Sequence, residues 1–221
     1  MKIFIKSFYL TITLAVLLGL PAWAQQNFDL HKMLKKGEIK SFNRELTAFK
    51  DGARAGIRLS KDEGEGVAWI EGLDFTNGTI EFDVRGENVK QHSFVGLAFH
   101  RKDNATFDAV YFRPFNFLEQ NPAAVSHQVQ YISLPEYPWR TLREKFPDAY
   151  EDEIFPKPNP DDWFHARIVV DGKKISVYVN NNTKACMEID KLTAQMSGAI
   201  GFYAADTSGG DFANLTVTKS K

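Results

Sequence analysis

Hydrophobic and polar residues alternate along much of this chain, and the alternation is clearest between Phe94 and Phe117 (FVGLAFHRKDNATFDAVYFRPFNF). Two runs rich in aromatic and β-branched residues flank a polar connector at Arg101–Thr106. One face of the paired runs carries Val95, Leu97, Phe99, Val110 and Phe112, and the other carries Phe94, Gly96, Ala98, His100, Tyr111, Arg113 and Phe115. Because successive side chains of a strand point to opposite faces, the pattern predicts a β-hairpin with one face in a core and polar and aromatic groups on the other.

Short segments of strand-like composition recur along the rest of the chain, and turn signals such as Asp51-Gly52 and Asp171-Gly172 separate several of them. Ahead of them, Phe28–Lys36 fits either a short helix or an arm docked on the sheets. The predicted strands are Glu45–Phe49, Ala55–Leu59, Val67–Ile70, Thr79–Arg85, Phe94–His100, Phe107–Phe115, Val129–Leu134, Phe164–Val170, Lys174–Asn180, Ala185–Ile189, Ala199–Ala204 and Phe212–Thr218. Many short strands with almost no helix predict an all-β fold, an antiparallel two-sheet jelly-roll sandwich.

One segment, Pro135–Pro160, departs from this rhythm and holds six of the nine prolines. Within it, Trp139, Leu142 and Phe146 recur at helical spacing until Pro147. We therefore expect a long inserted loop that carries a short helix. It would either cover a sheet edge or close over a ligand site, because loops of this length inside a domain are usually functional or disordered.

Residues 1–24 have the organisation of a secretory signal peptide. Lys2 and Lys6 precede an apolar run, and the small-x-small motif Ala22-Trp23-Ala24 follows it. The apolar run is shorter than the roughly 20 residues that span a bilayer, so we expect cleavage after Ala24 and no membrane insertion afterwards. This predicts a secreted or periplasmic bacterial protein whose residues 25–221 form a single jelly-roll domain.

The composition narrows the range of partners. The chain has 27 basic and 28 acidic residues, a net charge of −1, which argues against a nucleic-acid or anionic-membrane partner held by bulk charge. With 43% apolar residues the chain can form an ample core. Its single cysteine, Cys186, cannot form an internal disulfide and is expected to be a buried residue of a strand.

Three carboxylates lie on one face of the predicted strand Thr79–Arg85 or just beyond it: Glu81, Asp83 and Glu87. Retaining glycosidases use two carboxyl groups about 5–5.5 Å apart. Positions two apart on a strand are separated by about 6.7 Å and positions four apart by about 13 Å. Glu81 and Asp83 are therefore the candidate catalytic pair, since Arg85 lies between Asp83 and Glu87 and would keep them ionised. The alternative is an ordinary solvated face.

The outward face of the hairpin and its neighbours is the candidate ligand-binding surface. Its residues are Arg85, His100, Tyr111, Arg113, Phe115, Asn116, Gln130 and, from the inserted loop, Trp139. Tyr and Phe rings stack on the apolar face of a sugar, while Arg, Asn, Gln and His form planar hydrogen bonds that suit pairs of hydroxyls. In the structural alternative, Arg113 bridges a carboxylate such as Asp83, and the aromatic rings pack beneath the inserted loop.

Metal and cofactor signals are weak. The five histidines show no zinc-ligand spacing, and neither a phosphate loop nor a dinucleotide motif is present in the sequence. Asp206 and Asp211, in ADTSGGDF, offer oxygen ligands that would suit Ca²⁺, and a polar glycine-rich turn explains the same residues. We expect no cofactor, with calcium as the one candidate.

Several landmarks match one known group of sandwiches. They are FTNGTIEF at 75–82, VYFRPFN at 110–116, WFHARI at 163–168 with the hairpin DGKKISVYVN, and GAIGF at 198–202 followed by FANL at 212–215. On these residues, over about Leu46–Lys219, the chain resembles the concanavalin A-like lectin/glucanase superfamily. It is most similar to laminin-G-like jelly rolls of secreted bacterial proteins related to 3-keto-disaccharide hydrolase domains. The resemblance implies a jelly-roll fold, which hosts lectins, glycosidases and interaction modules. The catalytic pair of family 16 glycoside hydrolases, four residues apart, does not carry over, because Arg85 stands four residues after Glu81.

Three functions follow as hypotheses. The first is a secreted carbohydrate-binding protein that recognises a glycan or small sugar on the candidate ligand-binding surface. The second is a glycoside hydrolase or lyase that uses cleft carboxylates, with keto-disaccharides as the substrates that the resemblance implies. The third is a protein-interaction domain that binds no sugar.

Overall fold

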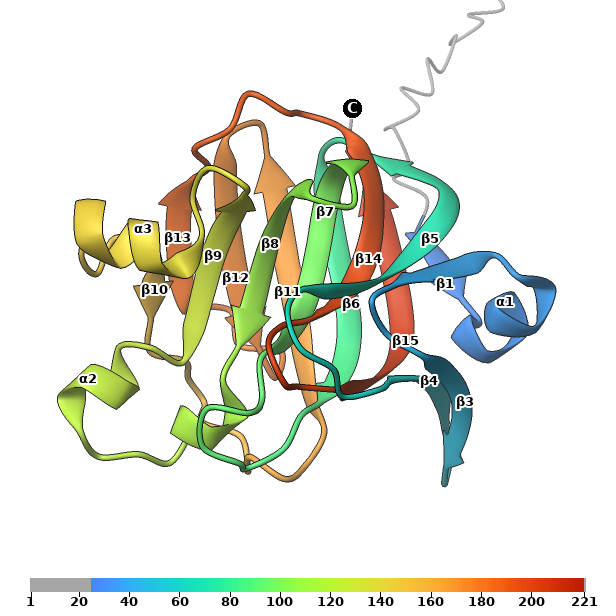
Figure 1. Cartoon of the computed structure of the whole chain (residues 1–221), viewed down its shortest axis with the longest axis horizontal. Coiled ribbons are helices and arrows are strands. Elements are labelled where there is room, and N and C mark those ends of the chain that lie inside the picture. The colour runs from blue at the N-terminus through green and yellow to red at the C-terminus, as the bar shows by residue number, and fades with distance from the viewer. Residues whose placement is uncertain (1–24, 221) are drawn as a thin grey trace, which may run out of the picture.

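Two antiparallel β-sheets packed face to face make up residues 25–220, the part of the chain that the computed structural model describes (Figure 1). In spatial order the eight-stranded sheet consists of β13 (Met187–Asp190), β12 (Lys174–Val179), β11 (Phe164–Asp171), β6 (Gly78–Arg85), β15 (Gly210–Lys219), β4 (Arg54–Leu59) and β3 (Leu46–Asp51), and β1 (Gln25–Phe28) also pairs with β15. The seven-stranded sheet consists of β10 (Glu151–Asp152), β9 (Val129–Leu134), β8 (Thr106–Phe112), β7 (Val95–Asp103), β14 (Gly198–Ala204), β5 (Gly66–Phe75) and β2 (Ile39–Phe42). This arrangement confirms the predicted all-β jelly-roll sandwich. The predicted signal peptide, residues 1–24, lies outside the described residues.

Helices are few and short. They are α1 (Leu30–Lys36), the 3-10 helix η1 (Pro114–Asn116), α2 (Pro122–Val125) and α3 (Trp139–Lys145). Asp29 caps the start of α1, where its carboxylate accepts a hydrogen bond from the amide of Lys32 at 3.0 Å. Within residues 25–220, no helix has the length and apolar character needed to cross a membrane.

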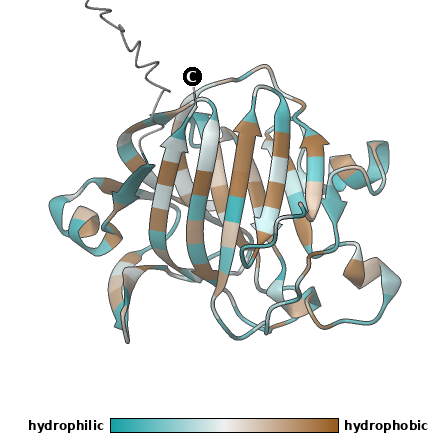
Figure 2. Ribbon diagram, turned by 180° about the vertical axis from the view of Figure 1, so that it is seen from behind, coloured by the Kyte–Doolittle hydropathy of each residue, from teal (hydrophilic) through white to brown (hydrophobic). Residues whose placement is uncertain are grey.

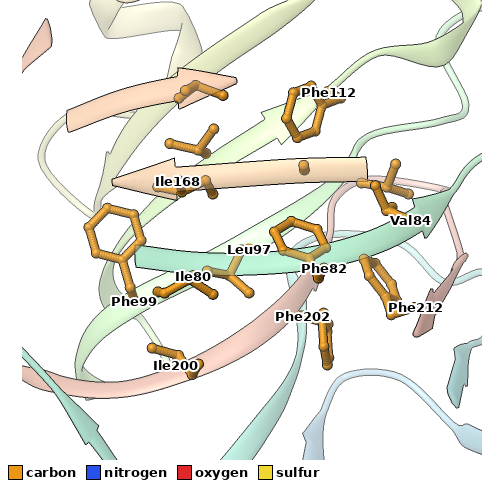
Figure 3. Close-up of a cluster of buried hydrophobic side chains, with 14 of the residues drawn as sticks. Ile80, Phe82, Val84, Leu97, Phe99, Phe112, Ile168, Ile200, Phe202 and Phe212 are labelled. Atoms are coloured by element: carbon orange, nitrogen blue, oxygen red, sulfur yellow. The ribbon is translucent and has the colours of Figure 1, made fainter. Parts of the chain in front are cut away.

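The core between the sheets is rich in aromatic rings. Phe82 of β6 and Phe212 of β15 come from one sheet, Phe202 of β14 comes from the other, and all three are fully buried. The ring centroids of Phe82 and Phe202 lie 5.9 Å apart, and those of Phe202 and Phe212 lie 4.7 Å apart. Figure 3 shows these rings among aliphatic side chains of neighbouring strands, and Figure 2 shows the alternation of hydropathy along the strands that produces this two-faced packing.

The predicted hairpin is formed by β7 and β8, where Gly96 pairs with Tyr111. The second strand is shorter than predicted: β8 ends at Phe112, and Phe115 belongs to η1. Every residue of β8 beyond Thr106 is buried, because its inner face lies in the core and its outer face lies under a second hydrophobic cluster. Polar groups next to this strand must therefore find partners within the protein.

The inserted segment Pro135–Pro160 contains the predicted short helix, α3. Leu142 of α3 is buried in the hydrophobic cluster on the outer face of the seven-stranded sheet. Further along, β10 extends the edge of that sheet by pairing with β9. In Figure 1 the segment lies beside β9 at this edge. The segment therefore does cover a sheet edge, which was one of its two predicted roles.

His100 does not lie on the outward face of the hairpin, and that prediction is wrong. The backbone at His100 has a φ of +53°, and the pairing of β7 with β8 shifts register between Phe99 and Asp103. Such a bulge interrupts the period of two and re-aims the side chain. The imidazole is fully buried, and it stacks on Phe75 of the core with ring centroids 6.1 Å apart.

His100 belongs to a buried polar cluster at the inner face of the seven-stranded sheet. Lys191 Nζ donates to His100 Nδ1 at 2.9 Å and to Asp108 Oδ2 at 3.1 Å, and the hydroxyl of Tyr131 donates to Asp108 Oδ1 at 2.7 Å. On the other side of the ring, His100 Nε2 donates to the carbonyl of Thr76 at 2.9 Å. Burial raises the pKa of Asp108, but hydrogen bonds and the charge of Lys191 outweigh that effect and hold the pKa below its usual range.

Replacing Lys191 by Ala should be strongly destabilising, because it leaves the Asp108 carboxylate buried without its cation. We expect a loss of about 3–5 kcal/mol in the free energy of unfolding, measured by chemical denaturation. The matched control is Lys174→Ala, which removes an exposed lysine 3.5 Å from Asp190 and should cost at most about 1 kcal/mol. Equal losses for the two variants would contradict a structural role for the cluster.

Candidate functional site

A cavity of about 880 Å³ opens on the outer side of the seven-stranded sheet, at the end where β8 runs into η1. Hereafter it is called the groove. Five predicted ligand-binding residues line it: Tyr111, Arg113, Phe115, Asn116 and Trp139. Other lining residues come from loops, from β14 and from α3, and they include Glu65, Phe94, His127, Arg143, Tyr203 and Asp206. The predicted surface is thus largely assembled in one place.

The floor of the groove is a hydrogen-bonded trio of Arg113, Tyr111 and Gln130. Tyr111 on β8 and Gln130 on β9 are direct cross-strand partners, which brings their outward side chains together. The Tyr111 hydroxyl donates to Gln130 Oε1 at 3.0 Å and accepts from Arg113 Nη2 at 2.8 Å, and Arg113 Nη2 also donates to Gln130 Oε1. The other terminal nitrogen of Arg113 donates to the carbonyl of His127 at 3.1 Å. Gln130, a predicted ligand-binding residue, contacts Tyr111 and Arg113 but lies below the lining of the groove.

Burial shifts the pKa values of two residues of the floor, Arg113 and Tyr111. Arg113 is only 4% exposed, and loss of solvent lowers the pKa of its guanidinium. Burial likewise raises the pKa of the Tyr111 phenol to about 12, so the hydroxyl stays neutral at physiological pH. The guanidinium carbon lies 4.9 Å from the centroid of the Tyr111 ring, a cation–π distance. The floor therefore presents one buried positive charge whose hydrogen-bond partners are neutral and whose ion-pair partner, Glu151, is 3.8 Å away.

Aromatic rings form the apolar part of the groove. The ring of Phe94 packs edge-on against Tyr111 and Phe115, with centroids 6.1 Å and 5.5 Å away. Trp139 of α3 is 43% exposed, so much of its indole faces solvent at the groove wall. A flat apolar surface beside buried hydrogen-bonding groups is the usual composition of a small-molecule site.

One end of the groove, beside β10, is an ion-pair cluster that the sequence interpretation missed. Arg143 of α3 holds the buried carboxylate of Glu151 with a forked pair of hydrogen bonds, Nε to Oε1 at 3.0 Å and Nη2 to Oε2 at 2.8 Å. His127 Nε2 lies 3.2 Å from Glu151 Oε1. Glu151 is the cross-strand neighbour of Gln130, but β10 has only two residues, too few to produce an alternation signal.

The other end, beside β14 and β5, holds a second missed pair. The hydroxyl of Tyr203 on β14 donates to Glu65 Oε2 in the loop before β5. Burial raises the pKa of the Glu65 carboxyl above its usual value, more than the hydrogen bond from Tyr203 lowers it. Glu65 belongs to a loop rich in glycine and acid residues, so hydropathy alone did not distinguish it from solvated neighbours.

Arg85 does not join the groove, and its predicted place beside the hairpin is wrong. Its strand, β6, lies in the other sheet between β11 and β15. There Arg85 Nη2 pairs with Asp211 at 2.7 Å and Nη1 pairs with Asp51 at 3.0 Å. Its guanidinium also covers Trp163, with 4.8 Å between the guanidinium carbon and the ring centroid. Local alternation predicted the strand, but it carries no information about which sheet the strand enters.

The candidate catalytic pair, Glu81 and Asp83, lies on the outer side of the eight-stranded sheet and does not share a cleft with His100. His165, the cross-strand partner of Asp83, places Nδ1 2.9 Å from Asp83 Oδ1 and Nε2 3.6 Å from Glu81 Oε1. Asp83 also accepts from Arg54 Nε at 3.1 Å and from Asn214 Nδ2 at 2.8 Å. Arg113 is not a partner of Asp83; the carboxylate with which it forms an ion pair is Glu151, whose Oε2 lies 3.8 Å from Arg113 Nη1.

The two calcium candidates are not brought together. Asp206 lines the groove, whereas Asp211 lines a smaller cavity on the eight-stranded sheet. The carboxylate of Asp211 accepts from Arg58 Nε at 2.6 Å and from Arg85 Nη2 at 2.7 Å. Among residues 25–220, no group of three or more His, Cys, Asp or Glu side chains is arranged to hold a metal ion.

The comparisons with known proteins identify the fold. No protein-family model and no curated protein matches the chain. Among solved structures, the carbohydrate-binding module CBM66 from Bacillus subtilis superposes with a TM-score of 0.59 at 11% identity, covering 82% of this chain and 96% of the module. A candidate glycosyl hydrolase from Parabacteroides distasonis gives 0.56 at 13% identity, with 89% and 100% covered. The luminal domain of VIP36 bound to Ca²⁺ and Man3GlcNAc gives 0.53 at 9% identity, with 83% and 84% covered. The chain therefore has the same jelly-roll fold as these structures.

The Asp83–His165 pair should make stability depend on pH in a defined window. Burial alone would raise the pKa of Asp83, but hydrogen bonds from His165, Asn214 and Arg54 outweigh this effect, so the pKa is lowered. For His165, the hydrogen bond to Asp83 raises the pKa of the imidazole. In the unfolded chain the Asp83 carboxyl has a pKa of ~3.9. Above that pH the ionised carboxylate stabilises the fold, and this stabilisation disappears as the pH falls through the lowered pKa of the folded state. In the unfolded chain the His165 imidazole has a pKa of ~6.5. Below that pH the protonated ring stabilises the fold, and this stabilisation disappears as the pH rises through the raised pKa of the folded state.

We therefore expect Asp83→Asn to destabilise the protein most between about pH 4 and 6.5, as measured by urea unfolding across the pH range. Asp190→Asn, at an exposed pair, serves as the control and should show a small difference without this window. A flat profile for Asp83→Asn would exclude the pair as a stabilising contact.

Proposed function

We propose that the protein binds a carbohydrate in the groove. The observation that carries the proposal is the floor itself: a buried Arg113–Tyr111–Gln130 trio beside exposed aromatic surface. Sugars present both hydroxyl pairs, which suit planar donors and acceptors, and C–H faces, which suit flat rings. The cavity of about 880 Å³ falls in the usual range for ligand pockets, roughly 300–1,000 Å³.

Fold neighbours support a sugar rather than another small molecule. One is a carbohydrate-binding module, and another is a lectin-like domain in complex with a mannose glycan. In this proposal the protein is exported through the signal peptide at residues 1–24 and meets its ligand outside the cytoplasm.

Trp139→Ala should weaken sugar binding about tenfold, because the exposed indole offers stacking area at the groove wall. A glycan array would first identify a bound oligosaccharide, and calorimetry with that oligosaccharide would then measure affinity. The melting temperature should hardly change, since the ring is 43% exposed.

The matched control is Phe146→Ala, which removes another exposed aromatic ring of the inserted segment that does not line the groove. This variant should bind the oligosaccharide normally. If both variants bind like the wild type, the groove is not the site. An array without hits, together with a reproducible protein pull-down, would favour the non-sugar interaction domain. Arg113 is a poor probe by itself, because its truncation would also unpair Tyr111 and Gln130.

Hydrolysis in the same groove is a second candidate, and one observation favours it. Glu65 lies in the groove wall with a raised pKa and a hydrogen bond from Tyr203, the condition of a carboxyl that can act as a general acid. This version of the hydrolase hypothesis replaces Glu81 and Asp83, which lie on the other sheet.

Glu65→Gln should then reduce sugar release from disaccharides, including 3-keto-disaccharides, by about 10²–10⁴-fold in a reducing-sugar assay. Glu81→Gln is the isosteric control on the other sheet and should leave the rate unchanged. Absence of turnover by the wild-type protein, or equal rates for both variants, would exclude Glu65 as a catalytic acid.

A further inference from the structure

Two guanidinium groups, those of Arg113 and Arg143, lie at the β10 end of the groove around one buried carboxylate, Glu151. The guanidinium of Arg113 makes its hydrogen bonds to neutral acceptors: the Tyr111 hydroxyl, the Gln130 amide oxygen and the His127 carbonyl. Arg113 forms an ion pair with Glu151, whose Oε2 lies 3.8 Å from Arg113 Nη1. A buried cation whose counter-ion is 3.8 Å away is less well compensated than one in a close hydrogen-bonded pair, so a ligand that supplies negative charge there gains affinity.

Glu151 cannot neutralise this end by itself. Arg143 already occupies both of its oxygens, Nε with Oε1 at 3.0 Å and Nη2 with Oε2 at 2.8 Å. A single carboxylate thus serves two guanidinium groups, and one of these groups, Arg113, lies at the groove floor. Glu119 also lines the groove, but within residues 25–220 it forms no ion pair with either guanidinium.

His127 adds no positive charge of its own, because burial lowers the pKa of its imidazole. Its Nδ1 lies 2.7 Å from the carbonyl of Ala123, so the proton of a neutral ring is on Nδ1. Nε2 then turns its lone pair toward Glu151 Oε1, 3.2 Å away, where two acceptors meet without a proton between them.

The floor also has a spare donor. The side-chain nitrogen of Gln130 is buried and has no hydrogen-bond partner within residues 25–220, because its oxygen is the atom that faces Arg113 and Tyr111. Buried donors without acceptors are rare in native proteins, but this one lies below the lining of the groove, because Gln130 is fully buried and is not a lining residue. The charged groups that the groove offers a ligand at this end are therefore the guanidinium groups of Arg113 and Arg143.

We propose that the sugar taken by the groove is an acidic one, with a carboxylate that pairs with Arg113 and Arg143. This inference rests on the proposed function and specifies its ligand class. A planar carboxylate matches the fork of a guanidinium in two parallel hydrogen bonds. The opposite end of the groove, beside β14 and β5, holds Glu65 and Asp206, which disfavour a second negative charge. The ligand is therefore a uronic acid joined to neutral sugar, oriented with its acid toward β10.

The test compares an aldobiuronic acid, a disaccharide of one uronic acid and one neutral sugar, with its methyl ester. The two probes have the same stereochemistry and differ in charge. Calorimetry on the full mature chain at low salt should show the acid binding about tenfold more tightly than the ester, and the difference should shrink as salt is added. Equal affinities, or tighter binding of the ester, would overturn the proposal.

Two variants separate a binding role from a structural one. Arg143→Gln, at a side chain that is 34% exposed, should remove most of the preference for the acid over the ester. Glu151→Gln should act in the opposite direction and strengthen binding of the acid several-fold, because both guanidinium groups lose their competing carboxylate. A merely structural cluster predicts weaker binding of both probes in both variants, in parallel with a lower melting temperature.

The outcomes also separate this inference from the proposed function. If neutral sugars from the array bind in a Trp139-dependent way while the acid shows no preference, the groove is a sugar site and the acidic ligand is wrong. If neither acidic nor neutral sugars bind, the proposed function itself fails.

Discussion

Burial of β8 on both faces is the constraint on which the groove depends. Its inner side chains contribute to the core between the sheets, and its outer side chains lie beneath a second hydrophobic cluster. A strand in this position has no water on either side, so every polar group along it must be paired inside the protein. Two clusters meet this requirement on opposite faces. Asp108 with Lys191 and Tyr131 lies inside the sandwich, and Tyr111 with Arg113 and Gln130 lies outside.

The two clusters have different consequences because of what surrounds them. The inner cluster is sealed: its lysine and its carboxylate are 3% and 1% exposed, and each has several partners. It fixes the segment between β13 and β14, which crosses from one sheet to the other. The outer cluster borders a cavity, and its guanidinium has a neutral hydrogen-bonding environment. Only the outer cluster can exchange an internal contact for a ligand.

The sequence predicted the local features well and the long-range ones poorly, for a physical reason. Alternation determines which residues of one strand share a face, so the outward position of Tyr111 and of Gln130 was predictable. It cannot anticipate the bulge that turns His100 inward, because a positive φ at a non-glycine residue leaves no mark in hydropathy. Nor does it determine strand order between sheets, which separates Arg85 and Asp83 from the hairpin. Glu65 and Glu151 were not predicted, because Glu65 lies in a loop and Glu151 lies in a strand of only two residues.

Charge pairing finally distinguishes the two outer faces of the sandwich. On the eight-stranded sheet, Asp211 accepts from two arginines, and Asp83 accepts from an arginine, a histidine and an asparagine, so these carboxylates already have their partners. On the seven-stranded sheet, Arg113 and Arg143 share one carboxylate, Glu151, beside β10, and Arg113 is 3.8 Å from it. A charge that is already paired closely stabilises a fold, whereas one with a distant partner beside a cavity can orient a ligand. The carboxylates that sequence alone marked as catalytic thus have their partners within the fold, and this difference supports the groove as the proposed ligand site.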